Sequence, residues 1–201
     1  MGWFGRAQRW GQSVDGIRIR SAQQSDAGSI AEVQWRTWQA AYLGLLPHEI
    51  LIGFGQSQGN GFWQRVLDQM VDGDAVLVAE LDQEIVGFIS SGPIRQSISG
   101  YRGEFYALYV LPEAQGCGIG TTLIAHAARG LVRQQWVNAA VWVLEDNHFG
   151  RQFYERLGGS QLGIAKTLAY RGTTYPAIRE VAYGWSDLRK ADWLVDEPGR
   201  R

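Results

Sequence analysis

The sequence has little cysteine, few histidines and almost no net charge, and each shortage excludes a class of protein. Its 201 residues include a single cysteine, so no disulfide can form within the chain, and a reducing compartment, the cytoplasm, is expected. The three histidines (His48, His126 and His148) lack the spacing of metal ligands, and no metal site is predicted. A formal net charge of −1 provides no basic surface for nucleic acid. No apolar run reaches the ~18 residues of a membrane span, so no membrane partner is expected.

The hydrophobic content and the mixture of periodic patterns indicate an α/β fold. A hydrophobic share of 45% in 201 residues is ample for the core of one domain. We expect that domain over residues 16–185, after a poorly ordered or weakly docked leader at 1–15 and before a solvated C-terminal tail at 186–201. The succession of helix-like and strand-like segments predicts a mixed, mostly antiparallel central sheet flanked by helices.

Periodicity predicts where the individual elements lie. The expected helices are at about 26–40, from Pro47, at about 62–71, and after Thr121 and Asn147, with a loop at 53–61. The expected strands are at 17–20, 75–81, 85–92, 103–111, 139–143, 160–168 and 177–185. Residues 82–84 are a short hairpin connection, and the last two strands are joined through residues 170–176.

The most informative segment is a glycine-rich turn, Gln115-Gly116-Cys117-Gly118-Ile119-Gly120, between a strand and a helix. Such a turn presents main-chain N–H groups and the positive end of a helix, so it can hold a phosphate chain. The spacing excludes a dinucleotide fingerprint, because the sixth position from Gly116 is Thr121, and the absence of lysine excludes a P-loop. An ordinary strand–helix turn that uses glycine for tight packing stays open as the alternative.

A second segment, from Asn147 to Gly159, follows the predicted strand at 139–143 with the letters N-H-F-G-R-Q-F-Y-E-R-L-G-G. Asn147 is a good helix cap and Gly158 a good helix stop. Together with the glycine-rich turn and the strand that begins at Glu104, this segment resembles the ordered motifs of the GNAT N-acetyltransferase superfamily. The resemblance covers about residues 17–184 and implies transfer of an acetyl group from acetyl-CoA to an amine.

The resemblance also implies which residues bind the co-substrate, acetyl-CoA. In the family, main-chain groups of the central strand bind the pantetheine arm and the glycine-rich turn holds the pyrophosphate. Asn147 either only caps its helix or also contacts the pantetheine arm. The implied residues are Leu108, Tyr109, Val110, Gln115, Gly116, Cys117, Gly118, Ile119, Gly120, Thr121 and Asn147. The Gln115 side chain is expected to cap a phosphate, and Cys117 is interpreted as a small filling residue because no histidine partner is evident.

Two residues are the candidates for proton transfer. Tyr154 matches the family tyrosine that protonates the leaving thiolate, and a phenol of ordinary pKa, near ~10, is protonated at neutral pH. Glu104, at the start of the central strand, is the candidate base for the cationic amine. The competing interpretations are a core tyrosine and a solvated glutamate at a strand end, with deprotonation through a chain of waters.

The acceptor side is predicted from Trp38 and Tyr42, two aromatic residues at the end of the first helix. In the family this helix borders the acceptor cleft, and an aromatic wall beside a carboxylate suits a cationic amine. Packing of both rings onto the sheet is the alternative. The acceptor itself, a small amine, a peptide N-terminus or a lysine, stays open, as do a longer acyl group, a hydroxyl acceptor and a homodimer. A catalytically idle CoA-binding module is the competing function, which the presence of both Asn147 and Tyr154 disfavours.

Overall fold

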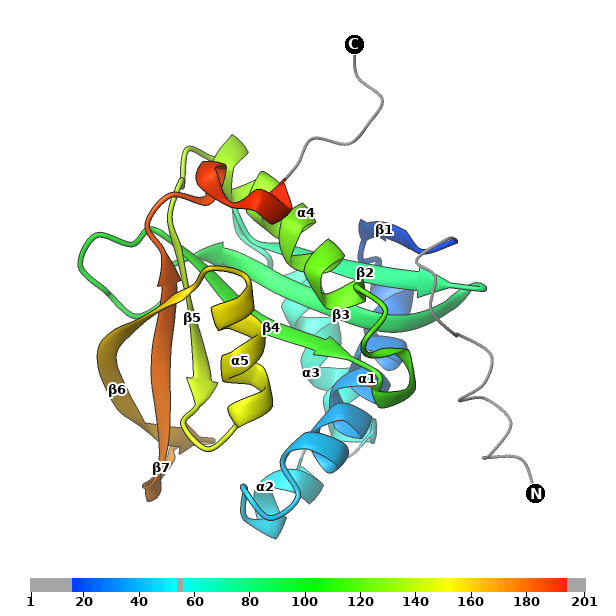
Figure 1. Cartoon of the computed structure of the whole chain (residues 1–201). Helices are drawn as coiled ribbons and strands as arrows, with labels where there is room; N and C mark the ends of the chain where they lie inside the picture. Colours follow the sequence, from blue (N-terminus) through cyan, green and yellow to red (C-terminus); the bar gives the residue numbers. More distant parts are fainter. Residues whose placement is uncertain (1–15, 54–55, 195–201) are drawn as a thin grey trace. The chain divides into compact units, whose positions relative to one another are not determined.

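The structure is a computed structural model and describes residues 16–53 and 56–194 (Figure 1). The strands of this part are β1 (Arg18–Ser21), β2 (Ala75–Leu81), β3 (Glu84–Pro93), β4 (Gly103–Val110), β5 (Ala139–Leu144), β6 (Ser160–Tyr170) and β7 (Thr173–Trp185). Its α-helices are α1 (Ala27–Ala41), α2 (His48–Gly53), α3 (Gln56–Asp68), α4 (Ile119–Arg133) and α5 (His148–Arg156). The strands form one sheet in the order β1-β2-β3-β4-β5-β7-β6, which confirms the predicted α/β fold with a mixed sheet.

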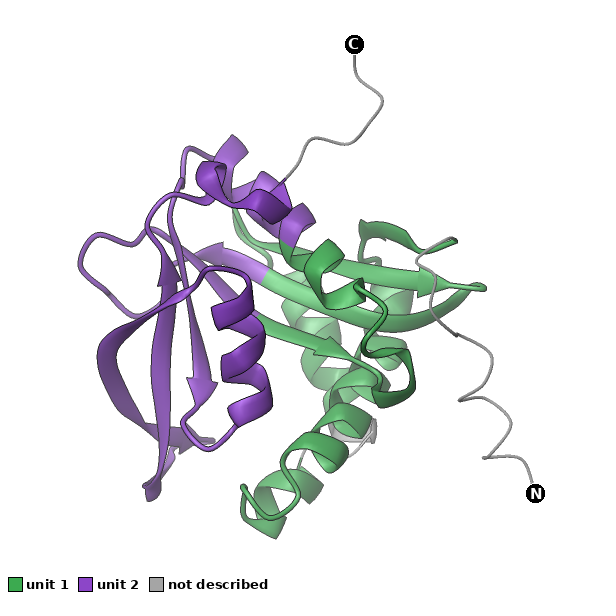
Figure 2. Cartoon of the chain, viewed as in Figure 1, with its two compact units in different colours: residues 1–90, 107–124 green, residues 91–106, 125–201 purple. Residues whose placement is uncertain are grey.

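The chain divides into two compact units, coloured separately in Figure 2. Unit 1 consists of residues 1–90 and 107–124, and unit 2 consists of residues 91–106 and 125–201. Within unit 2 the pairing of β4 with β5 is parallel, whereas β5 with β7 and β6 with β7 are antiparallel. In unit 1 the edge strand β1 pairs with β2 in antiparallel fashion. The expected leader at 1–15 lies outside the described residues.

Packing between helices determines where α3 begins in unit 1. The indole N–H of Trp63 donates to the Gln34 side-chain oxygen of α1 at 2.7 Å, and its ring lies 4.8 Å from that of Phe88. The predicted loop at 53–61 is therefore wrong from Gln56 onward, where the structure is helical. Glycine and asparagine weaken an isolated helix, but burial of an apolar face against α1 overrides that intrinsic preference.

The hairpin of unit 2 is longer than the sequence indicates. Its connection is the pair Arg171 and Gly172, both with positive φ (50° and 78°), as two-residue hairpin turns require. The predicted connection through residues 170–176 is wrong, because pairing resumes immediately after this turn. The register shifts near Pro176: Thr167 pairs with Arg179, but the next residue pairs with Tyr175. Proline lacks the N–H that the ladder needs, so the hairpin accommodates it as a bulge.

Part of the expected solvated tail is packed. Short 3-10 turns at Leu188–Lys190 and Asp192–Leu194 follow β7, and Leu188 is fully buried. The Leu188 N–H donates to the Val137 carbonyl at 2.7 Å, and the Trp193 indole donates to the Leu157 carbonyl at 2.7 Å. The prediction of a solvated segment is therefore wrong at Leu188, while the domain boundary at residue 185 stays a prediction. No helix in the described part of the chain is long and apolar enough to cross a membrane.

Candidate active site

The glycine-rich turn of unit 1 presents main-chain groups at the start of α4. Gly116 and Gly118 have φ of 79° and 82°, a region that residues with a Cβ rarely adopt. The Thr122 N–H donates to the Gly118 carbonyl at 2.9 Å as α4 begins. The N–H groups that precede this bond have no acceptor within the helix, which is the general condition of a helix N-terminus. The side chain of Ile119 is buried, so this residue presents only its main chain to a ligand.

The Gln115 side chain hydrogen-bonds the end of the strand that precedes the turn. Its amide donates to the Val110 carbonyl at 2.9 Å, and the same carbonyl accepts the Thr37 hydroxyl at 3.3 Å. This contact gives the Gln115 side chain a structural role, and its predicted contact with a phosphate stays a prediction. Cys117 is half-buried and forms no disulfide, and its Sγ lies 3.6 Å from the Gln115 carbonyl oxygen.

The strand β4 continues beyond its pairing with β5. The parallel register covers Gly103–Phe105 against Ala139–Val141, whereas β4 runs on to Val110. The segment Leu108–Val110, predicted to bind the pantetheine arm, therefore belongs to the later part of the strand, in unit 1. After the strand, the Leu111 N–H donates to the Val86 carbonyl of β3 at 2.8 Å. This hydrogen bond fixes the main chain just before the glycine-rich turn.

The two aromatic residues of the predicted acceptor side pack against each other in unit 1. The rings of Trp38 and Tyr42 are 5.7 Å apart between centroids, in an edge-to-face arrangement. Trp38 also meets Tyr109 of β4 at 6.4 Å, and Tyr109 meets Phe88 at 5.6 Å. The two residues thus lie together, as predicted, and they continue an aromatic cluster that reaches β4. This packing role does not test the predicted contact with an acceptor.

Glu104 is a buried carboxylate in unit 2, not a solvated residue at a strand end. Only 7% of its surface is exposed, and its Oε2 accepts the main-chain N–H of Arg95 at 2.8 Å. Burial raises the pKa of Glu104, although the Arg95 N–H and the charges of Lys166 and Arg95 oppose that rise and Glu180 adds to it. The raised pKa suits a group that accepts a proton from an amine near neutral pH.

Sequence reasoning missed the cations around Glu104. Arg95 lies in the loop between β3 and β4, and Lys166 lies on β6, more than sixty residues further along the chain. Lys166 donates to the Gln96 side-chain oxygen at 3.0 Å, lies 3.6 Å from a Glu180 oxygen and lies 4.1 Å from the ring centroid of Trp142. No local pattern could have paired these residues with Glu104, because the sheet register and the loop bring them together.

Tyr154 is part of the unit 2 core. It is 8% exposed, and its ring lies 6.0 Å from that of Trp185 and 6.4 Å from that of Tyr183. The neighbouring Tyr183 hydroxyl donates to Glu155 at 2.6 Å and accepts from Arg151 at 3.1 Å. Burial, followed by the bond to Glu155, raises the pKa of Tyr183. The ring of Tyr154 thus has the packing of a core residue, and its role as an acid stays a prediction.

Asn147 is the N-cap of α5, as its position in the motif predicts. Its side-chain oxygen accepts the Gly150 N–H at 2.9 Å. A Cβ at Gly150 would lie 2.7 Å from the Asn147 side-chain nitrogen, so the glycine three residues later permits this cap. The capping role is confirmed, and the second role, a contact with the pantetheine arm, stays a prediction.

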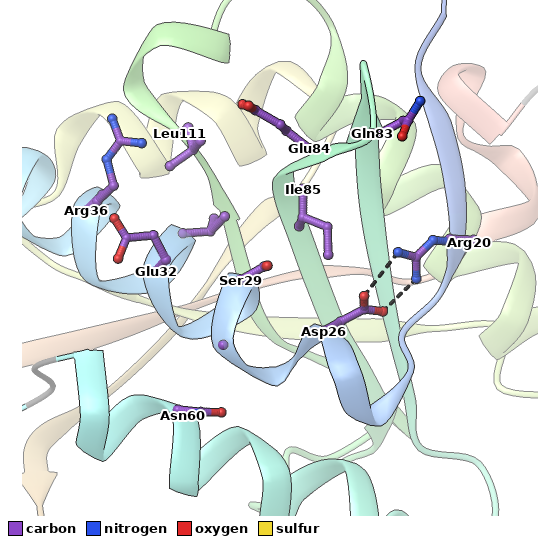
Figure 3. A pocket seen from close by; sticks show the side chains of 12 residues that line it. Arg20, Asp26, Ser29, Glu32, Arg36, Asn60, Gln83, Glu84, Ile85 and Leu111 are labelled. Atoms are coloured by element: carbon purple, nitrogen blue, oxygen red, sulfur yellow. Dashed lines mark hydrogen bonds and ion pairs between the residues drawn. The ribbon is translucent and has the colours of Figure 1, made fainter. Parts of the chain in front are cut away.

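A pocket of about 810 Å³ lies in unit 1 beside the first turns of α1 and the β2–β3 turn (Figure 3). No residue of the predicted site lines this pocket. Arg20 and Asp26 point toward one another at its edge, with nitrogen–oxygen distances of 2.6 and 3.1 Å. The Arg20 guanidinium also donates to Glu80 at 2.7 Å, and Arg36 pairs with Glu113 at 2.7 Å. These ion pairs stabilise unit 1.

The chain is similar to known proteins over most of its length. The model of the acetyltransferase (GNAT) family matches residues 30–159. The uncharacterized N-acetyltransferase YuaI of Bacillus subtilis (strain 168) is 30% identical over 185 residues, 90% of this chain and 99% of that protein. The spermidine N(1)-acetyltransferase of Thermoplasma acidophilum is 24% identical over 147 residues, 71% of this chain and 87% of that one. The solved structure of yncA from Salmonella typhimurium with acetyl-CoA shares the fold, with a TM-score of 0.62 at 19% identity over 89% of this chain and 97% of that chain.

Proposed function

The chain belongs to the acetyltransferase (GNAT) family, for which acetyl-CoA is the co-substrate, and on this premise we propose that it acetylates a primary amine. The amine attacks the thioester directly, without an acyl-enzyme, and belongs to a small molecule, a peptide N-terminus or a lysine. The observation that carries the proposal is the buried carboxylate of Glu104. Because its pKa is raised, this group is suited to take a proton from an ammonium ion near neutral pH.

Donor binding is assigned to main-chain groups of unit 1 and to Asn147. The segment Leu108–Val110 binds the pantetheine arm in the manner of an added strand, and the turn Gln115–Thr121 binds the pyrophosphate. The left-handed glycines of the turn and the free N–H groups at the start of α4 support this assignment. Asn147 caps α5 and adds a contact to the pantetheine arm.

The proposed chemistry accounts for two protons that leave the acceptor nitrogen. Glu104 takes the first proton from the ammonium ion, and the neutral amine then forms the new C–N bond with the thioester carbonyl. As the C–S bond breaks, the Tyr154 hydroxyl protonates the departing thiolate. The second proton from nitrogen restores that hydroxyl. Trp38 and Tyr42 supply the aromatic wall that a cationic acceptor contacts before it is deprotonated.

Release of free thiol from acetyl-CoA tests the proposed reaction. The acceptors are amino acids and their amides, short peptides, lysine-containing peptides and spermidine, which is the acceptor named for one relative. We expect thiol release that depends on both enzyme and amine. Binding without turnover for every acceptor would favour the catalytically idle module instead.

A matched pair of glycine variants tests the assignment of the pyrophosphate. Gly116 and Gly100 have similar φ (79° and 84°), and a Cβ at either would meet nothing within 4 Å, so alanine strains both backbones alike. CoA is expected to raise the melting temperature of the wild type and of Gly100→Ala. In Gly116→Ala its affinity is expected to fall at least about tenfold, because the added Cβ lies in the phosphate cradle. Equal affinity in both variants would contradict the assignment.

Three further predictions from the sequence are retained as proposals. The reducing cytoplasm is the proposed location, because a chain with a single cysteine, Cys117, can form no internal disulfide. A homodimer is the proposed assembly, to be tested by sedimentation of the purified chain in an analytical ultracentrifuge. The proposed domain boundaries are residues 16 and 185, and limited proteolysis of the purified chain would show where the first cuts fall.

A further inference from the structure

The side chain of Arg95 in unit 2 is a fixed cation that faces solvent. Its guanidinium carbon lies 3.4 Å from the centroid of the Tyr106 ring, which is a stacking distance. The ring is itself held, because the Tyr106 hydroxyl donates to the Pro93 carbonyl at 2.6 Å. Stacking leaves the N–H donors of a guanidinium free, since they point outward in its plane. Among residues 16–53 and 56–194, none forms a hydrogen bond or ion pair with this guanidinium.

The main chain of the same residue connects this cation to the candidate base. The Arg95 N–H donates to the Glu104 carboxylate at 2.8 Å, and the guanidinium is close enough to lower the pKa of Glu104 through its charge. A group bound by the Arg95 side chain would therefore lie near the carboxylate that takes the proton. This geometry suits an acceptor that has a second recognised group a few bonds from its amine.

The balance of charge around Glu104 indicates the sign of that second group. The charged side chains that affect the Glu104 carboxylate are Arg95, Lys166 and Glu180. Lys166 is already satisfied by Glu180, Gln96 and the ring of Trp142. Once Glu104 has accepted a proton, the charges of Lys166 and Glu180 balance each other and the positive charge of Arg95 has no counterpart among these four side chains. A planar guanidinium with free donors binds a carboxylate through two parallel hydrogen bonds.

Building on the proposed function, we propose that the acceptor is an amine that also carries a carboxylate. The Arg95 guanidinium binds the carboxylate, and the ammonium group faces Glu104. Amino acids and peptides with a free carboxylate near the reacting amine belong to this class. A polyamine does not, because its second ammonium group would be repelled by Arg95.

Matched acceptor pairs test the proposal. Each protein amino acid is compared with its own carboxamide, and spermidine is included, with thiol release from acetyl-CoA as the measurement. We expect at least one amino acid to show a kcat/KM about tenfold or more above that of its amide. The amides have less basic amines, which by itself favours them, so a preference for the acids reports recognition of the carboxylate.

Two variants of the same loop identify the residue responsible. Arg95→Gln removes the guanidinium but keeps the main-chain N–H that holds Glu104, and it is expected to lower kcat/KM for the acid about 10- to 100-fold, since a charged hydrogen bond is lost. The quantity compared is the ratio of kcat/KM for the acid to kcat/KM for the amide, because the loss of the Arg95 charge near Glu104 affects both acceptors alike. Arg102→Gln is the matched control, because Arg102 is an exposed arginine that ends the same loop and does not stack on Tyr106. It should keep the wild-type preference, and all three proteins should melt at the same temperature.

The outcomes separate this proposal from the proposed function. Acetylation of amides or spermidine as efficiently as the acids, or an unchanged preference in Arg95→Gln, would overturn the carboxylate proposal while acetyl transfer to amines stands. Thiol release with none of these acceptors would also overturn it. In that case, a rise in melting temperature with CoA would still support donor binding, and its absence would remove the proposed function as well.

Discussion

The two units hold different kinds of functional group. In unit 1, the groups proposed to bind the donor belong to the main chain, and their directions are fixed by the left-handed Gly116 and Gly118 and by the start of α4. In unit 2, the groups proposed to move protons are the side chains of Glu104 and Tyr154, and both are buried. Main-chain recognition depends on local backbone geometry, whereas proton transfer depends on the surroundings of a side chain.

This difference explains which substitutions each half tolerates. Any residue compatible with the backbone can present an N–H group, so the side chains of the donor turn can vary except where φ is positive. A carboxylate or phenol that transfers a proton needs both its own identity and a pKa set by its neighbours. Variants in unit 2 are therefore expected to change turnover and its pH dependence, and variants in the donor turn to change CoA affinity.

The largest expected effect comes from the Tyr154 hydroxyl. If Tyr154 protonates the leaving thiolate, Tyr154→Phe should lower kcat about 10²- to 10⁴-fold while CoA affinity is unchanged. Steady-state kinetics with an acceptor found in the panel measure this. Tyr183→Phe is the control within the same core: it removes the hydroxyl between Glu155 and Arg151, so it should lower stability and spare kcat. Wild-type turnover in Tyr154→Phe would mean that Tyr154 is a packing residue only.

The next effect concerns the pH dependence that Glu104 confers. Glu104 is a base only when ionised, and its pKa is raised, so kcat/KM of the wild type should fall as the pH drops through a value above the usual range for glutamate. Glu104→Gln should lower kcat/KM about 100-fold at neutral pH and abolish that inflection. An inflection that persists in the variant would assign it to another group.

Stability provides the control for Glu104. A carboxyl group whose pKa is raised by folding stabilises the fold below its unfolded pKa, and this contribution is lost as the pH rises through the folded pKa. At neutral pH the ionised Glu104 is therefore a cost to stability, and Glu104→Gln should melt no lower than the wild type. A clearly lower melting temperature together with reduced activity would indicate a structural role.

The parts of the molecule that the sequence predicts are those set by neighbouring residues. The turn before α4 needs glycine at Gly116 and Gly118 for positive φ, and the cap of α5 needs Asn147 with Gly150 after it. Each requirement spans a few residues, so it is visible as a motif. The β2–β3 connection is visible for the same reason, because Asp82 and Gln83 adopt the positive φ of a two-residue hairpin turn.

The parts that the sequence did not predict depend on contacts between distant segments. The helix at Gln56 forms because Trp63 packs against α1, and the polar residues before it give no sign of this. The burial of Glu104 and the stacking of Arg95 on Tyr106 arise where a loop folds over the sheet. A solvated and a buried glutamate have the same letter in the sequence, so the raised pKa could come only from the structure.

A smaller effect is expected on the free energy of unfolding when one ion pair in each unit is broken. In unit 1 the Arg20 guanidinium hydrogen-bonds Asp26 and holds the pKa of that carboxyl below its ordinary value of 3.8. A lowered pKa stabilises the fold above the unfolded pKa, and this contribution is lost as the pH falls through the folded pKa. Asp26→Asn should therefore lower the free energy of unfolding by about 1–3 kcal/mol at pH 7 and by less in acid. Urea unfolding at both pH values measures the difference.

An exposed pair in unit 2 is the control for Asp26. Glu145 lies 3.4 Å from Arg179, and both side chains are solvent-exposed. Glu145→Gln should change the free energy of unfolding by less than about 0.5 kcal/mol, because water and salt screen such pairs. A large loss in this variant, or none in Asp26→Asn, would contradict the assignment of the buried pair as the stabilising one.

The last expected effect concerns a buried donor in unit 2. The Trp142 indole N–H is buried, and no acceptor for it exists in the part of the chain that the structure describes. In unit 1, by contrast, the Trp63 indole donates to Gln34 at 2.7 Å. Trp142→Phe removes an unsatisfied donor and keeps an aromatic ring beneath Lys166, so the lost packing area and the relieved donor oppose each other. The net change in unfolding free energy should stay within about 1 kcal/mol.

Trp63→Phe is the matched substitution, and its cost should be larger by about 1–3 kcal/mol, because it leaves the buried Gln34 oxygen without its donor. Both values come from urea unfolding of the same preparation, with kcat/KM as a second measurement. Because Lys166 keeps Glu180 and Gln96 in Trp142→Phe, the charge near Glu104 is retained and kcat/KM should be unchanged. Equal losses of stability in the two variants would mean that the Trp142 N–H has an acceptor after all.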